Sequence, residues 1–177
     1  MLSLAMEKWG VHQRVAQLII RSVGNSKSKV LLGFLLATAL LSMWVSNTAT
    51  ALMMLPMALA VIDKIPKKKN SKYSLYLLLS IAYGASIGGM GTLVGSPPNV
   101  AMAGALEKTN GIKVDFTDWF AVGFPLSLIM LFIVFIYFRF LLGKEKHEKL
   151  EGLEFDDEPW TKNQIRVLIL FGIIVVL

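Results

Sequence analysis

The amino-acid sequence predicts an all-α integral membrane protein, and three observations support this fold class. First, 55% of the 177 residues are hydrophobic and only 17% are charged, whereas about 25% are charged in a typical soluble domain. Second, residues 30–62 and 73–106 contain no Asp, Glu, Lys, Arg or His, and each run is longer than the roughly 20 residues of one spanning helix. Third, the basic residues form short clusters between the apolar runs, as in multi-spanning membrane proteins. Despite a net charge of +6, this pattern argues against a soluble protein and against nucleic-acid binding.

Residues 1–29 are predicted to form an amphipathic helix at the membrane interface, as part of a scaffold. Charged and titratable residues interrupt its apolar sequence: Glu7, Lys8, His12 and Arg14. A signal peptide would instead contain an uninterrupted apolar core. We therefore expect this segment to lie along the membrane surface.

Residues 30–63 are predicted to form a re-entrant helical hairpin with a polar tip. Basic residues stand on both sides of the run: Arg21, Lys27 and Lys29 before it, and Lys64, Lys67, Lys68, Lys69 and Lys72 after it. Because basic residues are enriched in cytoplasmic segments, both ends are expected on the cytoplasmic side. The two halves, 31–45 and 49–62, are each roughly 20 Å long as helices, which is shorter than the hydrocarbon core. They meet at Ser46-Asn47-Thr48, the expected tip.

Residues 73–107 are predicted to form a broken transmembrane helix. The run is interrupted by the sequence GGMGTLVGSPPN at residues 88–99. Proline removes an amide donor and clashes with the preceding turn, so a regular helix cannot continue through this segment. Non-helical backbone at membrane depth exposes carbonyl groups that can coordinate a cation and helix N-termini that attract an anion.

The rest of the chain is predicted to contain one further transmembrane helix at residues 118–142, which starts with aromatic residues and ends near Arg139. Residues 143–164 are rich in Lys and Glu and are expected to be a cytoplasmic connector. The apolar residues 165–177 are too few to cross a bilayer, so we expect them to be the truncated start of another helix. The sequence is thus expected to be a piece of a longer membrane protein.

The two interrupted segments are predicted to form an ion and anion site. Because neither run contains a charged side chain, an anion would be held by Asn and Thr groups and by helix dipoles rather than by arginine. Each motif also has a simpler explanation, since polar residues in membrane helices often only bond a neighbouring helix. The glycines at positions 84, 88, 91 and 95 could likewise only permit close helix packing. The combination of a short hairpin and a Gly-Pro break favours a site.

Two segments carry a resemblance to a known family. Residues 42–50 read SMWVSNTAT and residues 91–99 read GTLVGSPPN, and together they resemble the divalent anion:sodium symporter (DASS) family. The resemblance covers nearly the whole chain. That family's fold contains two inverted repeats, each with a hairpin ending in an SNT motif and a broken helix opposite it. This sequence has one of each and therefore resembles most of the N-terminal repeat.

The resemblance implies roles for individual residues. The implied sodium ligands are Ser42, Ser46, Asn47 and Gly95. The implied contacts to a substrate carboxylate are Asn47, Thr48, Ser96 and Pro97. Oxygen ligands suit a hard monovalent cation, and a sodium ion beneath the anion would supply the positive charge that no side chain provides.

The implied activity is sodium-coupled symport of succinate-like di- or tricarboxylates across the cytoplasmic membrane. The parent protein would be a multi-pass homodimer in contact with lipid, with Na⁺ as the coupling ion, no organic cofactor and no enzymatic activity. Two alternatives stay open: a carboxylate exchanger that needs no sodium, and a short membrane protein with an interaction role. The choice among succinate, citrate and sulfate depends on pocket size and on residues outside this sequence.

Overall fold

A computed structural model of the chain describes residues 11–63, 65, 71–143, 147, 148, 150, 161, 165 and 166. The helices in this part are α2 (Val11–Val23), α3 (Lys27–Ser42), α4 (Asn47–Asp63), α5 (Ser71–Met90), α6 (Pro97–Asn110) and α7 (Phe116–Leu142). This part contains no β-strand, so the all-α prediction is confirmed for it. The predictions for residues 1–10, for most of the connector and for residues 167–177 fall outside the described residues.

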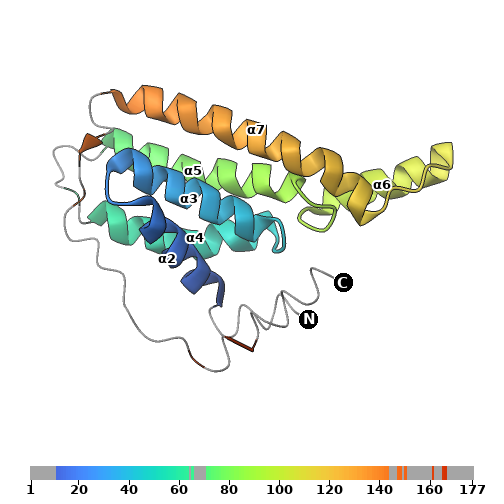
Figure 1. Ribbon diagram of the computed structural model, residues 1–177, viewed down its shortest axis with the longest axis horizontal. Helices are drawn as coiled ribbons and strands as arrows, with labels where there is room; N and C mark the ends of the chain where they lie inside the picture. The colour runs from blue at the N-terminus through green and yellow to red at the C-terminus, as the bar shows by residue number, and fades with distance from the viewer. Residues whose placement is uncertain are drawn as a thin grey trace.

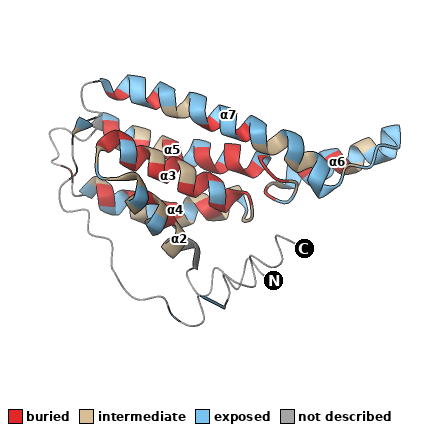
Figure 2. Cartoon of the chain, viewed as in Figure 1, coloured by how far each residue is buried: buried red, intermediate tan, exposed pale blue. Residues whose placement is uncertain are grey.

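Helix α3 lies at the centre of the bundle and packs against α2, α4, α5 and α7. Figure 1 shows α3 between its neighbours, with α7 running along α5 and with α6 extending beyond one end of the bundle. Most residues of α3 are buried, whereas α7 is largely exposed (Figure 2). A helix that is apolar on all sides is expected at the centre of a bundle. The core around it includes Leu31, Phe34, Leu41, Met54, Ala58, Tyr73, Leu77 and Phe138.

Two glycines of α5 allow α5 to approach α3 closely. A Cβ atom on Gly88 would overlap the backbone of Ala39, and one on Gly84 would lie 2.8 Å from the carbonyl oxygen of Leu35. Small residues at such positions bring two backbones together and increase van der Waals contact between membrane helices. Gly84 and Gly88 therefore have a packing role, and this packing aligns the end of α3 with the end of α5.

Two of the described helices are long and apolar enough to cross a membrane, namely Lys72–Met90 and Phe116–Leu142. The second of these, α7, begins with a capping box in which the Asp115 side chain accepts from the backbone N–H groups of Thr117 and Asp118. Most of its apolar surface is exposed, including Phe132, Ile133 and Phe140. An exposed apolar helix of this length is typical of a membrane protein.

The hairpin segment has different helix boundaries from those expected. The first arm is Lys27–Ser42, where residues 31–45 were expected, and the second arm is Asn47–Asp63, where residues 49–62 were expected. The connecting turn therefore covers residues 43–46, and Thr48 belongs to the first turn of α4. The Ser46 hydroxyl accepts from the backbone N–H of Ala49 at 3.4 Å, as serine commonly does at a helix N-cap. Insertion of this hairpin into the membrane from one side stays a prediction.

Candidate functional site

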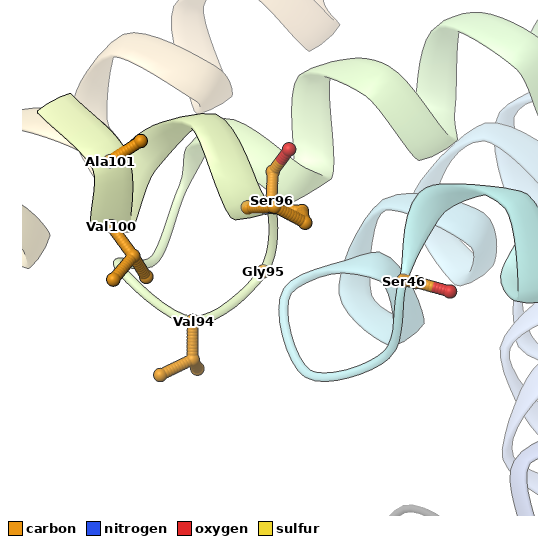
Figure 3. A pocket seen from close by; sticks show the side chains of 7 residues that line it. Ser46, Val94, Gly95, Ser96, Val100 and Ala101 are labelled. Carbon is orange, nitrogen blue, oxygen red and sulfur yellow. The ribbon is translucent and has the colours of Figure 1, made fainter.

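The turn between α3 and α4 lies against the segment between α5 and α6. We call residues 43–46 the hairpin tip and residues 91–96 the helix break. The Thr92 hydroxyl donates to the carbonyl oxygen of Met43 and so joins the two segments directly. Figure 3 shows the loop that carries Gly95 and Ser96 facing the loop that carries Ser46. Two interruptions that are about fifty residues apart in sequence are thus neighbours in the fold.

The hydroxyl of Ser42 lies in a cluster of oxygen atoms where the two segments meet. It is 2.7 Å from the Asn47 Oδ1 atom and 2.7 Å from the carbonyl oxygen of Ala85. Since a hydroxyl carries one proton, it donates to only one of these acceptors at a time. With the Asn47 amide in this orientation, lone pairs outnumber protons in the cluster. We call Ser42 Oγ, Asn47 Oδ1 and Ala85 O the oxygen cluster, and oxygen atoms of this kind are the ligands that hard cations take.

Two glycines leave room for further carbonyl groups beside the oxygen cluster. A Cβ atom on Gly95 would lie 2.7 Å from the Gly89 carbonyl oxygen and 3.0 Å from that of Ser42. A Cβ atom on Gly89 would overlap the Asn47 side-chain oxygen. Helices α3 and α5 also end here, and a helix C-terminus carries partial negative charge on its unpaired carbonyls. The local charge distribution therefore favours a cation.

Side-chain hydrogen bonds hold the helix break in its non-helical shape. The Asn99 amide nitrogen donates to the carbonyl oxygens of Gly89 and Thr92, both at 2.8 Å. The Thr92 hydroxyl in turn accepts from the backbone N–H of Gly95 at 3.0 Å. Thr92 and Asn99 are both buried. No role was predicted for these two residues from the sequence, although both are polar residues within a charge-free run.

A pocket of about 620 Å³ opens beside the hairpin tip and the helix break. Its lining residues are Ser46, Val94, Gly95, Ser96, Pro97, Val100 and Ala101 (Figure 3). This volume lies in the range of small-molecule sites. Ser96 is the N-cap residue of α6, and its side chain makes no capping hydrogen bond.

The N-termini of α4 and α6 both start at this pocket, since α4 begins beside Ser46 and α6 begins at Pro97. A helix N-terminus has unpaired N–H groups and partial positive charge, which favour an anion. The prolines at the start of α6 lack N–H groups, so the first turn of α4 is the better source of backbone donors. The arrangement therefore places features that favour a cation next to features that favour an anion.

The structure brings most of the predicted site residues together. Those in or beside the oxygen cluster, or in the pocket lining, are Ser42, Ser46, Asn47, Gly95, Ser96 and Pro97. Thr48 is exposed in the first turn of α4 and is not among the lining residues. The role of each residue toward an ion or substrate stays a prediction.

Comparisons with a family model and with individual proteins both relate this chain to carboxylate transporters. The citrate transporter (CitMHS) family matches residues 1–177. The chain is 40% identical over 159 residues to a sodium-dependent dicarboxylate transporter, SdcS, of Staphylococcus saprophyticus, which covers 85% of this chain and 31% of the relative. It is 38% identical over 159 residues to SdcS of Staphylococcus aureus strain USA300, with the same two coverages.

The chain thus spans about a third of the length of these curated relatives. Both relatives are named as transporters, and the resemblance expected from the SNT and GSPPN segments is confirmed. Because this family matches residues 1–177, the chain belongs to the citrate transporter family.

Proposed function

We propose that this chain forms the N-terminal part of a sodium-coupled symporter for di- or tricarboxylates in the cytoplasmic membrane. The observation that carries the proposal is the oxygen cluster of Ser42, Asn47 and Ala85 beside a pocket at two helix N-termini. The names of the relatives, which are sodium-dependent dicarboxylate transporters, support both the ion and the substrate class.

In this proposal the ion binds at the oxygen cluster, where the hairpin tip meets the helix break. Its ligands are the Asn47 side-chain oxygen and oxygen atoms of Ser42, Ser46 and Gly95. The oxygen cluster supports this assignment because it already holds more acceptors than protons. A monovalent cation fits such neutral oxygen ligands without a carboxylate.

The substrate carboxylate binds on the pocket side, next to the ion. Its contacts are Asn47, Thr48, Ser96 and Pro97, with the first turn of α4 supplying backbone N–H groups. The bound sodium ion adds positive charge close to the anion, so each ligand raises the affinity for the other. This mutual stabilisation is the thermodynamic basis of symport.

The complete protein is further proposed to be a multi-pass homodimer in the cell membrane, in contact with lipid. The two membrane-length helices support membrane insertion. The hairpin is proposed to enter and leave the bilayer on the cytoplasmic side, because its arms are short and basic residues flank it.

Uptake of labelled succinate by proteoliposomes that contain the complete transporter carrying this sequence tests the proposal. We expect uptake to require an inward sodium gradient, and we expect Asn47→Ala and Thr48→Ala each to abolish it while membrane insertion is retained. Asn110→Ala is a matched control, because Asn110 is exposed at the far end of α6. Normal uptake by Asn47→Ala would contradict the site assignment.

The same assay distinguishes the remaining alternatives. Uptake that is equally fast after sodium is replaced by choline would favour a carboxylate exchanger that needs no sodium. Competition by unlabelled succinate, citrate and sulfate would then identify the substrate class. Absence of any carboxylate uptake by the complete protein would favour a structural or interaction role.

A further inference from the structure

The hydroxyl of Thr50 in α4 is buried and has no hydrogen-bond partner. The residue is 0% exposed, and among the described residues its Oγ1 atom is the one buried side-chain nitrogen or oxygen that lacks a partner. Buried polar atoms in folded proteins are nearly always paired, so an exception needs an explanation.

Two other buried hydroxyls in the described helices, those of Thr38 and Ser80, bond the preceding turn of their own helix. Thr38 donates to the Phe34 carbonyl oxygen at 2.6 Å, and Ser80 donates to that of Leu77 at 2.7 Å. This bond within the helix is the usual solution for a threonine or serine in a helix interior. The Thr50 backbone N–H donates to the Ser46 carbonyl oxygen at 3.0 Å, but the Thr50 hydroxyl makes no hydrogen bond. Its oxygen is therefore available to a ligand.

Helix periodicity places Thr50 next to the oxygen cluster. Thr50 follows Asn47 by three positions, so the two side chains are neighbours on the same face of α4, with Cβ atoms about 5–6 Å apart. Asn47 contacts Ser42 of α3 and Gly89 of α5. Helix α4 packs against α3 and α5, and the Thr50 side chain is fully enclosed one turn farther along α4 on the helix face that carries Asn47.

We propose that the Thr50 hydroxyl is a further oxygen ligand of the cation site formed by Ser42 and Asn47. One ion would then be coordinated both by the Thr50 hydroxyl oxygen and by the oxygen atoms of the oxygen cluster, which has more acceptors than protons. The spacing of about 5–6 Å between the Cβ atoms allows both side chains to reach one ion. This inference rests on the proposed sodium-coupled function and adds a residue, Thr50, to which the family resemblance implies no role.

The test compares three variants of the complete transporter in proteoliposomes. Thr50→Val removes the hydroxyl with little change in shape, and Thr50→Ser retains it. Thr38→Val is the matched control, because the buried Thr38 hydroxyl already bonds its own helix. The measurements are the sodium concentration for half-maximal succinate uptake and the KM for succinate at saturating sodium.

We expect Thr50→Val to raise the half-saturating sodium concentration about tenfold, which corresponds to about 1.4 kcal/mol of lost binding free energy. Thr50→Ser should stay within about twofold of the wild type, and Thr38→Val should leave the sodium dependence unchanged. A structural role would lower the amount of folded protein without shifting this concentration. If Thr50→Val does not fold, Thr50→Ala provides the same comparison with Thr50→Ser.

The outcomes separate this inference from the proposed function. If the wild type shows no sodium dependence, both are wrong. If the wild type is sodium-dependent and variants that lack the hydroxyl respond to sodium as the wild type does, only the role of Thr50 is wrong. The role is also wrong if Thr50→Ser shifts the sodium dependence as much as Thr50→Val, or if Thr50→Val raises only the KM for succinate.

Discussion

The side-chain nitrogen of Lys27 lies 2.9 Å from the Oε2 atom of Glu148 and joins the start of α3 to the segment after α7. The Lys27 side chain is only 2% exposed, whereas that of Glu148 is 38% exposed. The Lys27 backbone N–H also donates to the Glu148 carbonyl oxygen at 2.9 Å, and that of Leu150 donates to the Asn25 carbonyl oxygen at 2.9 Å. Part of the predicted connector is therefore attached to the base of the hairpin.

Helix α5 contributes to the same attachment. The Tyr73 hydroxyl donates to the Lys27 carbonyl oxygen at 3.2 Å, and the Lys27 nitrogen lies 5.5 Å from the centre of the Tyr73 ring. A cation over an aromatic face is attracted by the negative face of the ring. The base of the hairpin is thus held by groups from two other parts of the chain, α5 and the segment after α7.

We expect Glu148→Ala to destabilise the protein, because it removes the Glu148 carboxylate that lies 2.9 Å from the buried Lys27 ammonium. The expected cost is about 1–3 kcal/mol, lower than for a fully buried pair because Glu148 is partly exposed to solvent. The apparent Tm of purified protein in detergent measures the effect. Glu107→Ala is the control, since Glu107 is exposed on α6. Equal Tm values for the two variants would show that the ion pair does not stabilise this attachment.

Gly88→Ala is expected to destabilise the contact between α3 and α5. The added Cβ atom would overlap the backbone of Ala39, which a side-chain rotation cannot relieve. The expected cost is about 1–3 kcal/mol, as for other overpacked cores. The control is Gly104→Ala in α6, where a Cβ atom would meet nothing within 4 Å. An unchanged Tm for Gly88→Ala would mean that the two helices can separate without cost.

Thr92→Val is expected to uncouple the hairpin tip from the helix break. It removes the hydroxyl that donates to Met43 and accepts from the Gly95 backbone N–H. If the relative placement of the two segments determines transport, succinate uptake should fall at least about tenfold, whereas Thr92→Ser should retain most activity. Uptake per folded transporter in proteoliposomes is the measurement. Equal activity of Thr92→Val and Thr92→Ser would contradict a role for this hydroxyl.

Asn99→Asp is expected to impair the site although it changes little in volume. The amide nitrogen of Asn99 donates to the Gly89 and Thr92 carbonyl oxygens, whereas an aspartate oxygen would face both carbonyls as an acceptor. We expect weaker sodium-dependent uptake and a lower Tm, since two buried carbonyls lose their donor. Asn110→Asp at the exposed end of α6 is the matched control. Normal Tm and uptake for Asn99→Asp would show that the break does not depend on these bonds.

Much of the helical architecture could be predicted from sequence because its signals are local. Apolar runs without charges predicted the helices, and the glycines and prolines near Gly95 predicted an interruption where α5 ends and α6 begins. The boundary at Asn47 was less predictable, because a polar SNT segment suits either a turn or a helix start. The observed helix start follows from Ser46 acting as an N-cap.

The sequence by itself determined the family and the all-α fold class and suggested candidate residues for the site, because composition and short motifs encode them locally. Only the tertiary structure decided which distant groups meet. It brought the Ala85 carbonyl to Ser42 and left the Thr50 hydroxyl buried without a partner. It also placed Lys27, which the sequence suggested only as a marker of topology, in an ion pair with the partly exposed Glu148. These relationships depend on the packing of α3 against α5 and on the path of the chain after α7, and no local pattern specifies either of them.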